Sequence, residues 1–111
     1  MAALRSVLLV DGAADTDAVL RAVLERRGAR VRRTRSHLLA TQSHRPDVVV
    51  IDIDHGGDTS AERAFGNTPQ VVLSSQRVVA TDAQSRFLEK PFQFPELIRA
   101  VEELLDSRPA A

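Results

Sequence analysis

Residues 45–54 read RPDVVVIDID, and this stretch decides the fold. Positions 48–51 form an unbroken apolar run, as expected for a strand that is covered on both faces of a parallel sheet. The run ends on Asp52. Three other apolar runs also end on a polar residue of the kind that handles phosphate or metal: 7–10 before Asp11, 71–73 before Ser74, and 87–89 before Lys90.

In an open parallel sheet the strands all point the same way, and ligands bind in the crevice beyond their carboxyl ends. We therefore expect two carboxylates, a hydroxyl and an amine to meet at one edge of the sheet, although they are far apart in sequence. The amine belongs to Lys90, the only lysine, since the other fourteen basic residues are arginine. A single flexible ammonium at a strand end favours a specific role over general surface charge.

The rest of the chain alternates strands and helices. Strands are predicted at 6–10, 29–33, 47–52, 70–74 and 86–89, and helices at 15–27, 36–44, 61–65 and 95–106. Asp15 or Thr16 is expected to cap the first helix, which Gly28 ends, and Pro95 suits the first turn of the last. We predict a polar loop over 54–60 and find no convincing helical repeat over 76–84. The alternation predicts an α/β three-layer sandwich with right-handed crossovers.

Length and composition set the class of protein. The chain has 111 residues, enough for one domain that buries roughly 65% of its unfolded surface. Fifteen acids balance fifteen bases, and there is no cysteine. No segment resembles a signal peptide or a membrane span. We expect a small cytoplasmic domain with no membrane partner. The arginine-rich stretch 26–35 lacks interleaved aromatic residues, so nucleic acid binding through this domain is unlikely from its sequence.

The ordered runs VLLVD, RPDVVVIDI, PQVVLSS and FLEKPF resemble those of receiver domains in bacterial response regulators. The resemblance covers nearly the whole chain. It implies a flavodoxin-like, five-stranded parallel sheet in the order 2-1-3-4-5. The expectation is one receiver-like domain over residues 1–111, with a core at about 5–106, acting in two-component signalling.

The resemblance assigns roles to particular positions. Asp52 looks like the phosphoryl acceptor, and Lys90 like the lysine that pairs with acceptor and phosphate. Ser74 stands where the family has the hydroxyl that senses the phosphoryl group. A Mg²⁺ ion is implied at the Asp11 and Asp52 carboxylates and the Asp54 backbone carbonyl. Magnesium and an ammonium would neutralise the phosphoryl oxygens while a carboxylate attacks phosphorus.

Two further features follow from the resemblance. Phe87 matches the aromatic switch residue of the family, and the peptide bond before Pro91 is expected to be cis. The implied partners are a histidine kinase or phosphotransfer protein, a downstream protein and, as a possibility, a second copy in a homodimer. The chain is not expected to be an enzyme, beyond autocatalysed phosphotransfer and dephosphorylation.

The sequence also departs from the family. Gly12 replaces the second of two adjacent acids, which normally touches the metal, so Mg²⁺ binding should be weaker; Gly12 can equally serve a tight backbone turn. The spacings from Asp52 to Ser74 and from Ser74 to Lys90 are short, which predicts shortened third and fourth helices. We therefore expect an atypical receiver.

Several alternatives stay open. The main one is a pseudo-receiver, an interaction module that keeps the pair of Asp52 and Lys90 but works without phosphorylation. Asp11 can simply cap a helix, Ser74 can bond to the backbone, and Phe87 can be plain core or half-exposed surface. Another alternative is a small flavodoxin-like or phosphatase-like catalyst that uses Asp52 as its nucleophile. It is less expected, because no glycine-rich phosphate loop follows the first strand. A transition-metal site around His55 and Asp58 is less expected than a solvated loop, because Gly56 and Gly57 lie between them.

Overall fold

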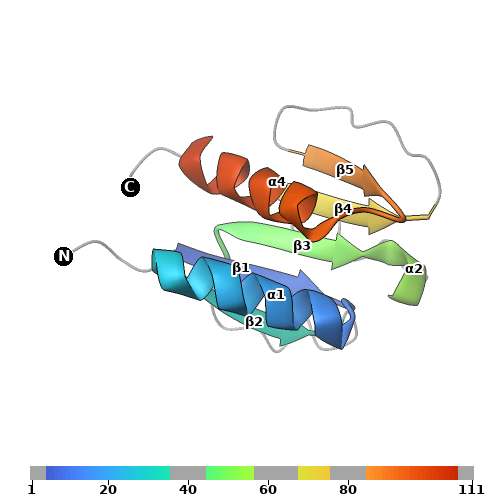
Figure 1. The fold of residues 1–111 in the computed structure, drawn as a ribbon, viewed down its shortest axis with the longest axis horizontal. Helices are drawn as coiled ribbons and strands as arrows, with labels where there is room; N and C mark the ends of the chain where they lie inside the picture. The colour runs from blue at the N-terminus through green and yellow to red at the C-terminus, as the bar shows by residue number, and fades with distance from the viewer. Residues whose placement is uncertain (1–4, 36–44, 57–67, 76–84, 108–111) are drawn as a thin grey trace.

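The computed structural model describes residues 5–35, 45–56, 68–75 and 85–107. This part of the chain contains five strands and four helical segments (Figure 1). In order they are β1 (Arg5–Val10), α1 (Ala14–Leu24), the 3-10 turn η1 (Glu25–Arg27), β2 (Ala29–Thr34), β3 (Val48–Asp52), α2 (Ile53–Gly56), β4 (Gln70–Ser74), β5 (Ser85–Glu89) and α4 (Phe94–Ser107).

The five strands form one parallel sheet in the order β2-β1-β3-β4-β5, which confirms the predicted topology. The charged strand β2 stands at an edge, where its arginines discourage pairing with a neighbour. Every residue of β3 and β4 is buried, as the continuous apolar runs predict. Because all pairs are parallel, the carboxyl ends of the strands lie at one edge of the sheet, where α2 also lies (Figure 1).

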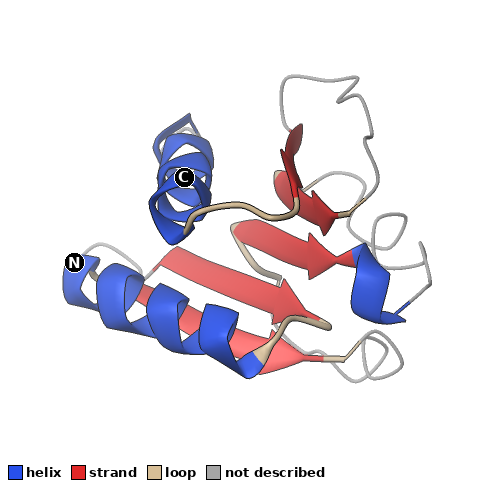
Figure 2. Cartoon of the chain, turned by 45° about the vertical axis from the view of Figure 1, so that its right-hand side comes forward, coloured by secondary structure: helices blue, strands red, loops and turns tan. Residues whose placement is uncertain are grey.

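Both long helices cover the same face of the sheet (Figures 1 and 2). Leu20 and Leu24 of α1 and Leu97, Val101 and Leu104 of α4 are almost fully buried there. They pack with alternate strand residues, namely Val7, Leu9, Val31, Val48, Val50, Val71 and Leu73. An apolar stripe at helical spacing explains both helices, since each has one face to bury. None of the described helices combines the length and apolar character that a membrane span requires.

The other face of the sheet carries a second buried cluster, Leu8, Val10, Val49 and Ile51, against which Ile53 packs. A three-layer sandwich was predicted from the alternation of strands and helices, and burial on both faces of the sheet agrees with it. The segments expected to provide its other helices, 36–44, 61–65 and 76–84, lie outside the described residues. The predicted shortening of the third and fourth helices lies outside them as well.

The start of α1 differs from the prediction. The residue before its first turn is Ala13, which offers no side-chain cap, so the expected cap at Asp15 or Thr16 is wrong. Asp15 instead lies in the first turn, where an acid suits the positive end of the helix dipole, and Thr16 is buried. The helix ends at Leu24, and η1 leads to Gly28, whose φ of 88° is the left-handed conformation expected of a glycine cap.

The segment after β3 is also more ordered than predicted. A loop was expected from Asp54, but Ile53–Gly56 forms one helical turn directly after the strand. The backbone N–H of Asp54 donates to Oδ1 of Asp52 at 3.1 Å, so the acceptor carboxylate itself helps to start this turn. At the other end of the chain, Pro95 lies in the first turn of α4 as predicted.

Candidate functional site

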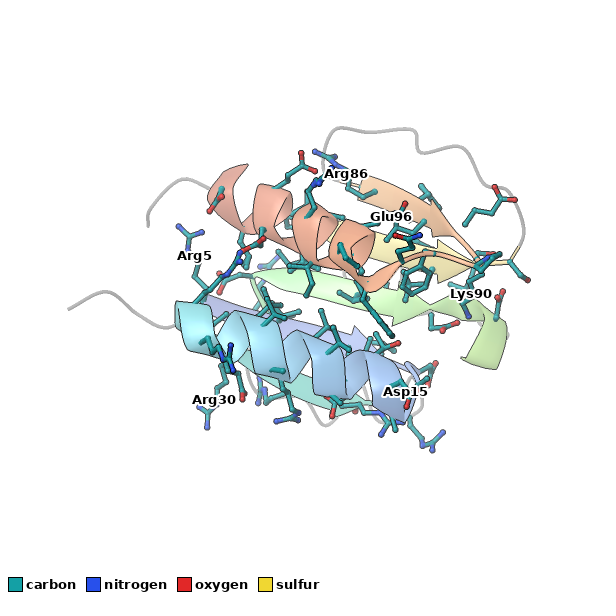
Figure 3. All side chains as sticks on the ribbon, viewed as in Figure 1. Arg5, Asp15, Arg30, Arg86, Lys90 and Glu96 are labelled. Atoms are coloured by element: carbon teal, nitrogen blue, oxygen red, sulfur yellow. The ribbon has the colours of Figure 1, made fainter. Side chains whose placement is uncertain are left out.

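The strand register brings the four sequence-predicted polar residues together at the carboxyl ends of the strands. Val10 of β1 pairs with Ile51 of β3, so Asp11 and Asp52 follow side by side. Asp52 pairs with Leu73, which places Ser74 one residue beyond on β4. The backbone N–H of Lys90 donates to the carbonyl of Ser74 at 2.8 Å, which fixes the end of β5 against β4. Figure 3 shows Lys90 at this edge, next to α2.

Lys90 and Asp52 form the centre of the site. The Lys90 ammonium donates to both carboxylate oxygens of Asp52, each at 2.8 Å. The side chain of Asp52 is only 5% exposed, and that of Lys90 is 25% exposed. A buried carboxylate needs a compensating charge or hydrogen bonds to stay ionised, and this ammonium supplies both. An ionised carboxylate at the rim of a sheet can act as a nucleophile.

The side chain of Asp54 joins the same cluster. The sequence had indicated Asp54 as a metal ligand through its backbone carbonyl and as a carboxylate near Asp52, but contacts with Lys90, Ser74 and Ser75 were not predicted for it. Its Oδ2 accepts the backbone N–H of Ser75 at 2.7 Å and lies 3.3 Å from the Lys90 ammonium. Its Oδ1 lies 3.4 Å from the hydroxyl of Ser74, a long hydrogen bond. A sequence signal did exist, because Asp54 follows Asp52 by two positions and two serines end the next strand.

The charges of this cluster stabilise one another. Partial burial raises the pKa of the Asp54 carboxyl, but the backbone N–H of Ser75, the Lys90 ammonium and the Ser75 hydroxyl outweigh it and hold that pKa below 3.8. Burial lowers the pKa of Lys90, but its hydrogen bonds and charge interactions with Asp52 and Asp54 outweigh burial and hold the pKa above 10.5. Lys90 therefore carries its positive charge throughout the neutral range.

The loop between β1 and α1 has a constrained shape. Asp11 has a φ of 57°, in the left-handed region that Asp tolerates better than most residues, and its N–H donates to the carbonyl of Thr34 at 2.9 Å. A Cβ at Gly12 would lie 2.5 Å from Cδ1 of the buried Leu9. The Arg33 guanidinium, which the sequence did not single out, donates to the carbonyl of Gly12 at 2.9 and 3.1 Å. The glycine is therefore required by packing.

These residues fit a divalent cation only weakly. Asp11 directly follows β1, Asp52 ends the neighbouring β3, and the backbone carbonyl of Asp54 comes two residues later. All three offer oxygen ligands of the type that Mg²⁺ uses. Position 12 contributes no carboxylate and has no room for one. Among the residues that the structure describes, no group of three or more Asp, Glu or His side chains is placed to hold a metal ion.

The two remaining predicted positions lie on or next to β5. Phe87 is half-buried in this edge strand and pairs with Val72 of β4, which fits the expectation of partly exposed core as well as that of a switch. The Lys90–Pro91 peptide bond is cis. Beyond it, Phe92 and Phe94 make an edge-to-face contact with ring centroids 6.1 Å apart, at the start of α4.

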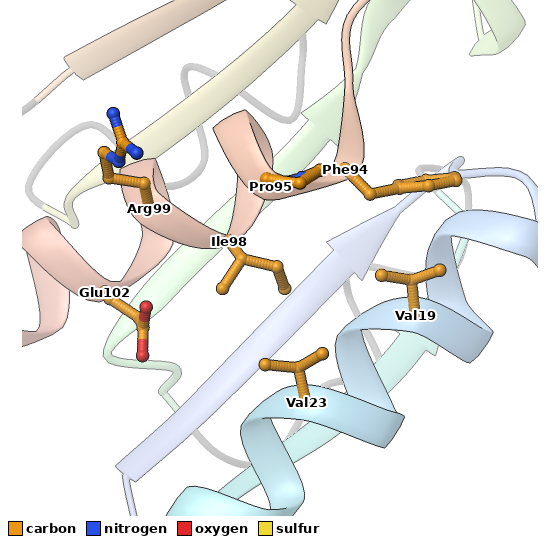
Figure 4. Close-up of a pocket in the computed structure, with 7 residues that line it drawn as sticks. All are labelled: Val19, Val23, Phe94, Pro95, Ile98, Arg99 and Glu102. Atoms are coloured by element: carbon orange, nitrogen blue, oxygen red, sulfur yellow. The ribbon is translucent and has the colours of Figure 1, made fainter.

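A groove of about 470 Å³ lies elsewhere, between α1 and α4 (Figure 4). Val19 and Val23 face Phe94 and Ile98 across it, and Arg99 and Glu102 lie along its polar side. None of the titratable residues of the strand-end cluster lines this groove. Its lining is mainly apolar, without the convergent charges that a phosphate or metal site needs, so the candidate site is the cluster around Asp52 and Lys90.

Comparisons with solved structures identify the fold family of this chain. No family model matches the sequence, and no curated protein matches it. Solved structures do match. A response regulator receiver protein from Sinorhizobium medicae is 26% identical, with a TM-score of 0.65, over 96% of this chain and 98% of that one.

Two further structures are similar over nearly their whole length. A response regulator from Thermotoga maritima is 21% identical with a TM-score of 0.68, over 95% of this chain and 100% of its own. A receiver domain protein from Bacillus halodurans is 18% identical with a TM-score of 0.71, over 96% and 97%. The chain thus has the fold of response regulator receiver domains, as the sequence predicted.

Proposed function

We propose that this chain is the phosphoacceptor receiver domain of a two-component response regulator, in which Asp52 accepts a phosphoryl group from a histidine kinase or phosphotransfer protein. The contact of the Lys90 ammonium with both oxygens of the buried Asp52 carboxylate carries this proposal. An ion pair at the carboxyl ends of a parallel sheet, in a receiver fold, is what acceptance of a phosphoryl group requires. The fold alone would support any receiver-like role.

The transfer follows from the geometry of the pair. An oxygen of Asp52 attacks the phosphorus of a phosphohistidine, an O–P bond forms, and the N–P bond breaks with its electron pair left on the imidazole. Lys90 offsets the negative charge on the phosphoryl oxygens from beside the acceptor. The hydroxyl of Ser74, at the end of the strand between them, would donate to the new group.

Mg²⁺ is part of this proposal as a weakly held ion. The carboxylates of Asp11 and Asp52 and the backbone carbonyl of Asp54 would hold it, and it would supply further neutralisation of the phosphoryl oxygens. The weakness follows from Gly12, whose contact with Leu9 leaves no room for another acid. Lys90 therefore contributes a larger share of the neutralisation here than it would in a site with a third carboxylate.

The proposal is tested by phosphorylation in vitro. The wild-type chain, incubated with acetyl phosphate and Mg²⁺ or with a cognate kinase, should gain the mass of one phosphoryl group, and Asp52→Asn should gain none. Asp106→Asn is the matched control, because that side chain is 83% exposed and pairs with Arg5 at the opposite end of the sheet. It should be modified like the wild type. An unmodified wild type under all these conditions would exclude the phosphoacceptor role.

A pseudo-receiver is the second candidate. It is favoured by the missing acid at position 12 and by the contacts of Asp54, which engage Ser74, Ser75 and Lys90 without phosphate. Such a module would bind its downstream protein partner through its surface alone. Partner binding, measured by pull-down and calorimetry, should then survive Asp52→Asn unchanged, and loss of binding in that variant would count against this candidate.

A further inference from the structure

The carboxylate of Asp54 is held by three donors from two strand ends. The N–H of Ser75 lies 2.7 Å from Oδ2, the ammonium of Lys90 lies 3.3 Å from Oδ2, and the hydroxyl of Ser74 lies 3.4 Å from Oδ1. A backbone amide, a hydroxyl and an ammonium that converge on one anion form a binding site for an oxyanion. In this structure the protein fills that site with its own side chain.

One of these donors, the Lys90 ammonium, also contacts Asp52. Lys90 contacts the carboxylates of Asp52 and Asp54 together, so the two acids share one ammonium. The N–H of Asp54 donates to Asp52, which keeps the two residues adjacent. A phosphoryl group on Asp52 would place about 1.5 to 2 negative charges, instead of the single charge of its own carboxylate, and three acceptor oxygens next to the Asp54 carboxylate. It would compete with that carboxylate both for space and for the donors.

The two acids differ in how freely they can move. The side chain of Asp52 is 5% exposed and held in the body of the sheet, whereas that of Asp54 is 28% exposed. Asp54 lies on the single helical turn Ile53–Gly56, outside the strands. Rotation of Asp54 into solvent therefore exchanges protein hydrogen bonds for water, without opening the core. Of the two acids, Asp54 is therefore the one that can move away and release its hydrogen-bond donors to a phosphoryl group.

We propose that the Asp54 carboxylate is an internal occupant of the phosphoryl site, which holds Ser74, Ser75 and Lys90 until a phosphoryl group on Asp52 displaces it. This inference rests on the phosphoacceptor function proposed above. Its first consequence is that, in the unmodified domain, Ser74, Ser75 and Lys90 already donate to a negatively charged group. Its second is that the wild type accepts a phosphoryl group more slowly than a chain in which position 54 is neutral and small.

The test compares phosphorylation rates with acetyl phosphate and Mg²⁺ in the wild type, Asp54→Ala, Asp54→Asn and the control Asp106→Ala. Removal of the competitor should raise the rate for Asp54→Ala about tenfold. Asp54→Asn keeps an acceptor for the Ser75 amide but loses the charge that attracts Lys90, so its rate should fall between the two. Asp106→Ala should match the wild type. Amide spectra of all four proteins check that the fold is retained.

The outcomes separate this inference from the function on which it rests. Equal or slower modification of Asp54→Ala, with a modified wild type, overturns the internal occupant and leaves the phosphoacceptor role intact. Modification of both proteins, with Asp54→Ala modified faster than the wild type, supports both. Absence of an adduct on every variant, with a cognate kinase also present, overturns both. A Ser75 amide whose shift and hydrogen exchange are the same in the wild type and Asp54→Ala would also overturn the occupant, whatever the rates.

Discussion

The ammonium of Lys90 reaches across the end of β4 to lie 2.8 Å from each carboxylate oxygen of Asp52 on β3. The contact joins two strands that are not neighbours in the sheet. It also encloses the end of β4, so Ser74 lies between the two charges in strand order. A change at any one of these three strand ends is therefore expected to affect the other two.

Loss of the ammonium should destabilise the fold. Lys90→Met leaves the Asp52 carboxylate, which is 5% exposed, without its charge partner. We expect the unfolding free energy to fall by about 1–3 kcal/mol, and no more than that because Lys90 is itself 25% exposed and partly screened by water. Urea denaturation at pH 7 measures it. Arg26→Met, at an exposed arginine of η1, is the control and should change stability by less than about 0.5 kcal/mol.

A second substitution checks the cause. Adding Asp52→Asn to Lys90→Met removes the buried charge, so the double variant should regain part of the lost stability. A double variant that is less stable than Lys90→Met would show that packing of the lysine side chain, and not its charge, matters at this position.

The low pKa of Asp54 predicts a dependence of stability on acid pH. Because the folded-state pKa lies below 3.8, the ionised Asp54 contributes stability above the unfolded value. That contribution is lost as the pH falls through the folded pKa. The difference in unfolding free energy between the wild type and Asp54→Asn should thus be constant near neutral pH and shrink below about 3.8. A constant difference down to pH 2 would contradict the assigned contacts.

An acid introduced at position 12 should fail to rebuild a metal site. A Cβ there would lie 2.5–2.6 Å from three side-chain carbons of Leu9, which is fully buried. We expect Gly12→Asp and Gly12→Ala each to lose about 1–3 kcal/mol through overpacking. Mg²⁺ affinity, followed by NMR shifts, should not rise in Gly12→Asp. A tighter Mg²⁺ site in a stable Gly12→Asp would contradict this explanation.

A double-mutant cycle isolates the contact behind that prediction. Leu9→Ala removes the clashing carbons, so Gly12→Ala should be less harmful in that background than in the wild type. We expect a coupling of about 1 kcal/mol or more, measured by urea denaturation of the four proteins. Additive losses would mean that the contact with Leu9 is not what makes glycine necessary at position 12.

Asp11 should affect the cation more than the fold. Asn tolerates a positive φ as Asp does, so Asp11→Asn preserves the turn with its φ of 57° while removing one carboxylate. We expect a change of less than about 0.5 kcal/mol in stability but a several-fold weaker response to Mg²⁺ in the shifts of Asp52 and Ser74. An unchanged Mg²⁺ titration would assign Asp11 a purely local role.

The sheet could be predicted because each strand carries its signal locally. A run of apolar residues that is covered on both faces, such as 48–51, allows few other interpretations, and the polar residue at its end marks the rim. The convergence of Asp52 with Lys90 then follows from the parallel arrangement. The edge position of β2 was visible in its charges, since Val31 is its only clearly apolar residue.

The local details were predicted less well because they depend on contacts between distant segments. Ala13 begins α1 without a side-chain cap, which propensity cannot foresee. The side chain of Asp54 turns towards Ser75 only because β4 ends beside α2. The bond from Arg33 to Gly12 likewise depends on the pairing of β2 with β1. In the sequence, Arg33 looked like an ordinary surface charge, and Asp54 was expected near the metal site but not in contact with the two serines.

The packing of Leu9 against Gly12 has an evolutionary consequence. A glycine codon becomes an aspartate codon by a single-base change, so mutation offers the missing acid repeatedly. The first carriers of that change would meet an occupied core and be disfavoured before any gain in cation binding could be selected. An acid at position 12 would be tolerated better after Leu9 had shifted or become smaller, so the order of the two substitutions affects whether the acid can be gained.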